Sequence, residues 1–237
     1  MAVGIAVATA LAAVFSWLVW RSYARYKRAE FIRRYAFPTG LFDKLAARRA
    51  GLERRDIALV SRGLRQFFLA YLNSGRQFVS MPSQVADELW HEFILYTRNY
   101  DAFCRQAFGG FFHHSPAVVL APAQRNRNAG LRRVWWHCCK EENINAGNPT
   151  RLPLLFALDA KLKIDTGFTY AANCTALRAG GRGDMYCGGD FADASFDGGT
   201  SGFGEGAADG GLGSGSDGGS SDGGGGCGGG GCGGGGD

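Results

Sequence analysis

An uninterrupted apolar run opens the chain. Residues 2–20 contain no charged residue and no proline. At about 1.5 Å of rise per residue, a helix over this run spans roughly 28 Å, close to the hydrocarbon core of a bilayer. Trp17 and Trp20 lie at one end of it, where amphipathic rings prefer the headgroup level. The pattern predicts a transmembrane helix over 1–20, continued by a basic juxtamembrane helix over 21–35.

Basic residues follow the apolar run and none precedes it. The positive-inside rule then predicts a single-pass protein of the inner (cytoplasmic) membrane, with the rest of the chain in the cytoplasm. The alternative is a cleaved signal peptide, because small residues of the kind found at cleavage sites occur around Ala8 and Ala10. Such a peptide needs a positively charged start, which this chain lacks, and the apolar run continues to Trp20. We therefore favour an anchor.

Apolar positions recur at helical spacing through residues 36–175, which predicts one small helical domain with a single core. Helices are expected at about 41–50, along the apolar stripe from Ile57 to Tyr71, at 84–107 after an N-cap at Ser83, at 123–143 after Pro122, and from Pro153 to Leu162. Residues 167–170 are expected to be extended. Because no run of alternating strands occurs, the predicted fold class is mainly α.

The last part of the chain has a different composition. From Gly180 onward it contains 28 of the 38 glycines and nine acids against one base. Such sequence has much backbone entropy to lose and little apolar area to bury. We therefore predict a disordered, low-complexity, glycine-rich acidic tail over 176–237. We interpret Cys227 and Cys232 as two solvated thiols, with a disulfide or a soft-metal chelate as the alternative.

Charge separates the two parts. Residues 1–179 carry a net charge of +13 and the tail carries −8, which together give the net +5 of the chain. A basic body beside a bilayer is attracted to anionic headgroups, so the membrane is an expected partner. No nucleic-acid motif accompanies the bases, and no nucleic-acid partner is expected. The acidic tail can also contact the basic body, weakly and in a salt-sensitive way.

Three of the four histidines fall between residues 91 and 114, close to an acid in the same segment. The candidate site consists of Asp87, Trp90, His91, His113 and His114. Asp87 and His91 are four residues apart and share a helix face. The histidines after Gly110 are expected on a loop that is free to turn back towards His91.

The predicted metal ligands are His91, His113 and His114, and the ion would be zinc or iron. Adjacent histidines do not easily bind one ion together, so one ligand and one hydrogen-bonding partner is the expected division. The alternative is a hydrogen-bonded cluster without a cofactor. For Asp87 and Glu88, the alternative is stabilisation of the helix N-terminus.

Cys104 and His137 are not expected to belong to the candidate site. Thirteen residues of helix separate Cys104 from His91 and turn its side chain to another side, so we interpret Cys104 as a core residue. His137, next to Cys138 and Cys139, is expected at a helix surface or at the edge of the core. The seven cysteines are an odd number with an adjacent pair, which is a poor disulfide framework.

A set of motifs resembles the bacterial glycine-rich domain-containing-protein-like family. They are Pro82-Ser83, Asp87, Trp90-His91, Tyr100, Phe103-Cys104, His113-His114-x-Pro116, Leu152-Pro-Leu-Leu-Phe156, Asp159 and Phe168-x-Tyr170. The resemblance covers about residues 80–175, and the Gly/Cys tail is similar in kind. It implies a site region and no particular reaction.

Two functions fit these observations. The favoured one is a membrane-tethered interaction or scaffold module with a protein partner. The alternative is a metal-dependent, hydrolase-like enzyme, with His91 and His113 or His114 as ligands and Asp87 or Glu88 as orienter or base. The chain contains no serine elbow, Walker loop or dinucleotide fingerprint, so no catalytic signature is complete and no small-molecule substrate is indicated.

Overall fold

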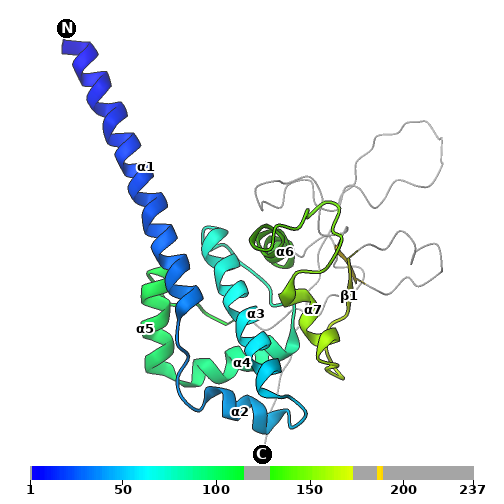
Figure 1. The fold of residues 1–237 in the computed structure, drawn as a ribbon. Coiled ribbons are helices and arrows are strands. Elements are labelled where there is room, and N and C mark those ends of the chain that lie inside the picture. The colour runs from blue at the N-terminus through cyan, green and yellow to red at the C-terminus, as the bar shows by residue number, and fades with distance from the viewer. Residues whose placement is uncertain (1, 115–128, 173–185, 189–237) are drawn as a thin grey trace, which may run out of the picture. The chain divides into compact units, whose positions relative to one another are not determined.

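A computed structural model describes residues 2–114, 129–172 and 186–188, and this part of the chain is mainly helical (Figure 1). Its elements are α1 (Ala2–Arg34), α2 (Leu41–Arg48), α3 (Arg54–Asn73), α4 (Gln84–Leu95), α5 (Thr97–Phe108), α6 (Ala129–Glu141), α7 (Leu154–Lys161), β1 (Tyr170–Ala171) and β2 (Tyr186–Cys187). The mainly α fold class is confirmed. Most of the glycine-rich tail, with Cys227 and Cys232, lies outside the described residues.

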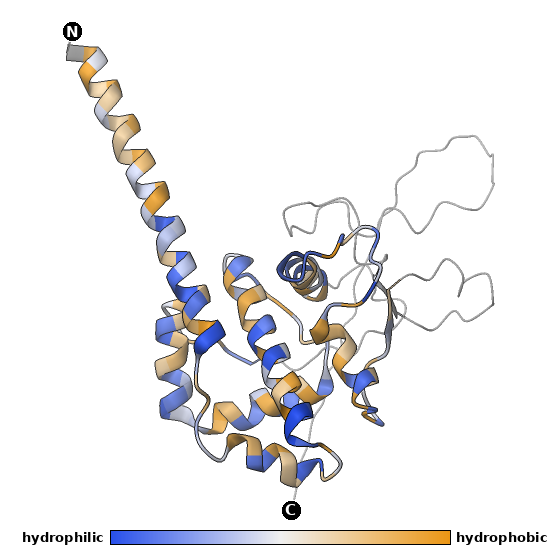
Figure 2. Ribbon diagram, in the orientation of Figure 1, coloured by the Kyte–Doolittle hydropathy of each residue, from blue (hydrophilic) through white to orange (hydrophobic). Residues whose placement is uncertain are grey.

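Helix α1 joins the predicted apolar and juxtamembrane segments into one helix. Among the described residues it is long and apolar enough to cross a membrane, and a signal sequence near the N-terminus passes the same test. Figure 2 shows the change from apolar to polar residues along its length. The apolar part is exposed, whereas Ala29 and Ile32 near the other end are buried. Only the end of α1 therefore belongs to the core.

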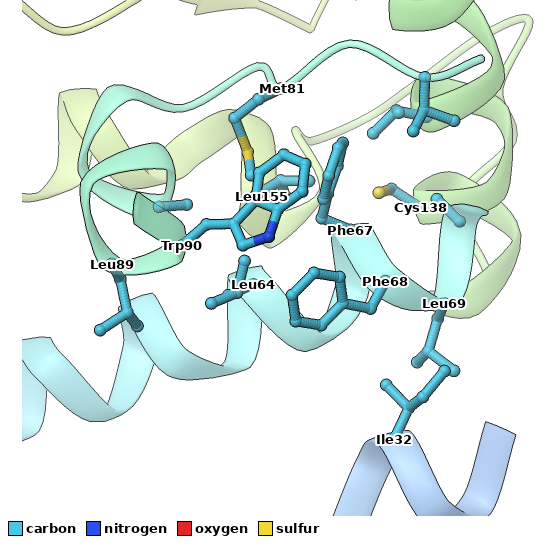
Figure 3. Packing of buried hydrophobic residues seen from close by; sticks show 14 of the residues in the cluster. Ile32, Leu64, Phe67, Phe68, Leu69, Met81, Leu89, Trp90, Cys138 and Leu155 are labelled. Carbon is cyan, nitrogen blue, oxygen red and sulfur yellow. The ribbon is translucent and has the colours of Figure 1, made fainter. Parts of the chain in front are cut away.

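Helix α3 is the centre of the core and packs on α1, α4, α6 and α7. Its start is fixed by a capping box in which Glu53 and Asp56 each accept from the other's backbone N–H. Phe67 and Phe68 are fully buried on α3, and Figure 3 shows both rings among the packed core side chains. A Cβ on Gly63 would lie 2.4 Å from a methyl group of Leu158, so the glycine permits the close approach of α7.

The predicted single helix over 84–107 is interrupted, which corrects the sequence-based expectation. Tyr96 has φ −80° and ψ 58°, outside the helical region, and it lies between the end of α4 and the start of α5. Helix α4 packs on α2, α3 and α7, while α5 packs on α1 and α4. One straight helix could not contact both sets of neighbours. Because of the bend, the apolar residues of α4 pack against α2, α3 and α7, and those of α5 pack against α1.

A short parallel sheet follows α7, and its second strand lies after residue 175 in the sequence. Strand β1 pairs in parallel with β2, with Tyr170 opposite Tyr186. Beyond β2, a Cβ on Gly188 would lie 2.5 Å from the Trp135 ring of α6, so the chain passes directly over that ring. A two-residue strand has no periodicity to read in the sequence. The start predicted for α6 at Pro122 lies outside the described residues.

Candidate functional site

The first turn of α4 is fixed by a buried carboxylate from α7. Asp159 accepts hydrogen bonds from the Ser83 hydroxyl at 2.7 Å and from the backbone N–H groups of Gln84 at 2.7 Å and Val85 at 3.2 Å. The predicted N-cap at Ser83 is confirmed, because its Oγ accepts from the N–H of Ala86. Asp159 therefore helps to fix the first turn of α4, in which Asp87 lies. Sequence reasoning gave Asp159 no role in the site.

Asp87 brings two histidines together. Its Oδ1 lies 2.8 Å from Nε2 of His114, and its Oδ2 lies 3.5 Å from Nδ1 of His91. One ligand atom from each of the three residues can be chosen so that all lie within 4.8 Å of one another. The two imidazole rings are 4.1 Å apart, centre to centre. Asp87 and His91 share a face of α4, as their spacing predicts, and His114 returns to that face after α5.

A buried network holds the segment that carries His114. The Trp90 indole N–H donates to the hydroxyl of Tyr100 at 3.1 Å, and this hydroxyl donates to the backbone carbonyl of Phe112. Burial raises the pKa of Tyr100 far above its ordinary value, so the phenol stays protonated and remains a donor. The Phe112 ring stacks on Trp90 at 4.9 Å. The network thus fixes the chain two residues before His114.

Trp90 forms the base of the site, and its ring centre is 4.4 Å from that of His114. Figure 3 shows Trp90 beside Met81, Leu155 and Phe67. The ring centres of Trp90 and Phe67 are 5.1 Å apart. Trp90 is therefore a core residue with one edge at the site. Its indole N–H is used within the core, so the residue shapes the site rather than offering a ligand.

One side of the cluster is open to solvent. The side chain of His91 is 49% exposed, whereas those of Asp87 and His114 are 18% and 12% exposed. Glu88 faces elsewhere, since both its oxygens accept from Arg49, the residue after α2, at 2.6 and 3.0 Å. Its role as an alternative base is not supported by this geometry, and Asp87 is the acid at the site.

The remaining candidates lie away from the cluster. His113 is exposed and its ring is 4.8 Å from that of Phe111, so the structure places it outside the group. Cys104 is fully buried, which confirms it as a core residue. His137 on α6 is 9% exposed, which fits the expected edge of the core rather than a helix surface. Burial, helped by Lys140 and Arg133, lowers its pKa to about 4.

The distances of the cluster can be compared with those of a metal centre. Zinc–ligand bonds of about 2.0–2.1 Å place the ligands of a tetrahedral site roughly 3.3 Å apart. Oδ2 of Asp87 lies 3.5 Å from Nδ1 of His91, close to this value, and Oδ1 lies 2.8 Å from Nε2 of His114, a hydrogen-bond distance. These contacts use different carboxylate oxygens, and one ligand atom from each residue lies within 4.8 Å of the others, so the side chains have to rearrange to bind one ion. Two imidazoles and one carboxylate suit zinc or ferrous iron and leave coordination positions free.

A protein-family model, UCP032817-like, matches residues 27–191. The matched region contains the helical domain with the whole candidate site, and it leaves out the apolar run and most of the tail. The match does not show the glycine-rich family that the motifs resemble; it supports membership of an uncharacterised family. No curated protein and no solved structure matches the chain. The chain belongs to the UCP032817-like family, an uncharacterised family.

Proposed function

We propose that this protein is a membrane-anchored helical domain that binds a divalent transition metal through Asp87, His91 and His114. The observation that carries the proposal is the convergence of three ligand atoms within 4.8 Å. It differs from the ligand set expected from the sequence, because Asp87 takes the place of His113. The half-exposed His91 leaves the proposed ion accessible from solvent.

The chemistry proposed for the site follows from its open side. A metal held by three protein ligands supplies a Lewis acid and lowers the pKa of a bound water. Trp90 and the buried side of His114 exclude water from one half of the site. A hydrolase-like reaction is the class that this arrangement suits. The interaction or scaffold role favoured by the sequence has no feature of comparable specificity among the described residues.

The anchor is the second part of the proposal. It is supported by the exposed apolar part of α1 and by the bases that follow it. In this proposal the helical domain lies in the cytoplasm at the inner membrane, as the positive-inside rule leads us to expect. A signal sequence is the competing interpretation, and it predicts a mature protein without residues 1–20.

Metal analysis of the full chain, purified in detergent, tests the metal site. We expect about one equivalent of zinc or iron in the wild type, as a single three-ligand site requires. His91→Ala should remove it, whereas His113→Ala, the matched control, should retain it. His91 is half-exposed, so its replacement leaves the core intact. Equal metal content in both variants, or none in the wild type after incubation with zinc and dialysis, refutes the proposal.

A further inference from the structure

A groove of about 800 Å³ lies at a different place from the metal cluster. It is lined by residues of α3, α6 and α7, by Arg33 near the end of α1, and by the segment before α7. Leu59, Leu69 and Leu154 contribute apolar surface to it. No member of the Asp87 cluster lines the groove, so it is a separate feature with its own chemistry.

The two acids of the groove are already neutralised. Glu141 pairs with Arg33 of α1 at 2.9 Å, and Glu142 pairs with Arg151. Glu142 also accepts from Nε2 of Gln66 and from the N–H of Leu154. Burial alone would raise the pKa of Glu142, but these hydrogen bonds and Arg151 lower it. Both carboxylates are therefore paired with arginines, so neither is the counter-ion of the remaining bases of the groove.

Three bases of the groove have no carboxylate partner among the described residues: Arg62, Arg65 and Lys161. Arg65 donates to the backbone carbonyls of Tyr35 and Ser61, and its Nε is buried without a hydrogen-bond partner. A partly buried charge without a counter-ion is unfavourable. The groove consequently carries three unbalanced positive charges beside apolar side chains.

These charges are spread over two helices, which suits an extended acidic peptide with apolar side chains better than a single compact anion. The tail contains such a segment. Residues 190–197 read Asp-Phe-Ala-Asp-Ala-Ser-Phe-Asp and supply three carboxylates and two phenylalanines. Farther along the tail, the acids are diluted by glycine and serine.

The described chain brings this segment within reach. Gly188 passes over the Trp135 ring of α6, and Trp135 precedes the groove residue Glu142 by seven positions, about 10 Å along a helix. Eight extended residues span up to about 27 Å. We propose that residues 190–197 bind the groove between α3, α6 and α7, with their carboxylates facing Arg62, Arg65 and Lys161.

Photo-crosslinking in the full chain tests this inference. With p-benzoylphenylalanine at position 196, we expect intramolecular crosslinks to groove residues such as Leu59, Leu69 and Leu154. The combined change Asp190→Asn, Asp193→Asn and Asp197→Asn should reduce their yield about fivefold or more, as should 1 M salt, because the attraction is electrostatic. Arg62→Glu with Lys161→Glu should act in the same way.

The matched control is Asp209→Asn with Asp217→Asn and Asp222→Asn, which changes the net charge equally and should leave the yield unchanged. Crosslinks spread over other surfaces, crosslinks only between molecules, or an equal loss in this control overturn the inference. None of these variants touches Asp87, His91 or His114. Metal content measured on the same samples therefore separates failure of this inference from failure of the metal proposal.

Discussion

His114 lies 2.8 Å from Asp87 although 27 residues separate them. The contact joins the first part of α4 to the segment that follows α5. It depends on the bend at Tyr96, which lets α5 fold away and the chain return, and on the Tyr100 hydroxyl, which holds Phe112. The position of His114 therefore depends on core residues, and substitutions of those residues should change the geometry of the cluster.

Tyr100→Phe tests this dependence. The variant leaves the Trp90 indole N–H and the Phe112 carbonyl without their buried partner, which should lower the free energy of unfolding by about 1–3 kcal/mol. It should also weaken metal binding, because the segment before His114 is less firmly held. Denaturant unfolding and zinc titration measure the two effects. Tyr96→Phe, whose hydroxyl has only a 3.5 Å contact with Thr39, should change neither.

The i, i+4 spacing was sufficient to predict that Asp87 and His91 share a face. It could not choose between His113 and His114, because that choice depends on how Phe112 packs on Trp90. The helix break could not be read from apolar spacing either, since both halves keep a helical period. The sequence marked Asp159 only as part of a family motif and did not predict its hydrogen bonds, because its partners Gln84 and Val85 lie 75 and 74 positions away. Contacts at such separation leave no periodic signal in one sequence.

Asp159→Asn should be strongly destabilising. The buried carboxylate accepts from the backbone N–H groups of Gln84, Val85 and Phe168 and from the Ser83 hydroxyl. An amide turns an NH₂ group towards at least one of these donors, so we expect a loss of about 3 kcal/mol or more in unfolding free energy. The exposed Asp165→Asn is the control and should lie within about 0.5 kcal/mol of the wild type. Similar midpoints in denaturant for both variants would contradict this role.

His137 should make the domain sensitive to acid. Its pKa of about 4 in the fold lies below the ordinary value of about 6.5, so only the unfolded chain takes up this proton between the two values. Stability is full above pH 6.5 and falls as the pH drops towards 4, by up to about 3 kcal/mol. His137→Phe should lose this part of the acid dependence. Parallel stability–pH curves for the two proteins would show that His137 contributes nothing.

A reporter fused after residue 237 tests the anchor and its orientation. If α1 spans the membrane with its bases inside, the protein should fractionate with the membrane, keep residues 1–20, and show activity from a reporter that works only in the cytoplasm. Replacing Arg21, Arg25, Lys27 and Arg28 by glutamine should weaken this orientation. A mature protein that begins after residue 20 would instead identify a signal sequence.

X-ray absorption spectroscopy of the zinc-loaded full chain tests whether Asp87, His91 and His114 bind the metal. We expect nitrogen and oxygen neighbours at about 2.0–2.1 Å, with the multiple scattering of two imidazoles and no sulfur. In the His91→Ala variant this spectrum should be lost together with the bound zinc. Sulfur neighbours at about 2.3 Å would place the metal on cysteines such as Cys227 and Cys232 instead, and would contradict a site at Asp87, His91 and His114.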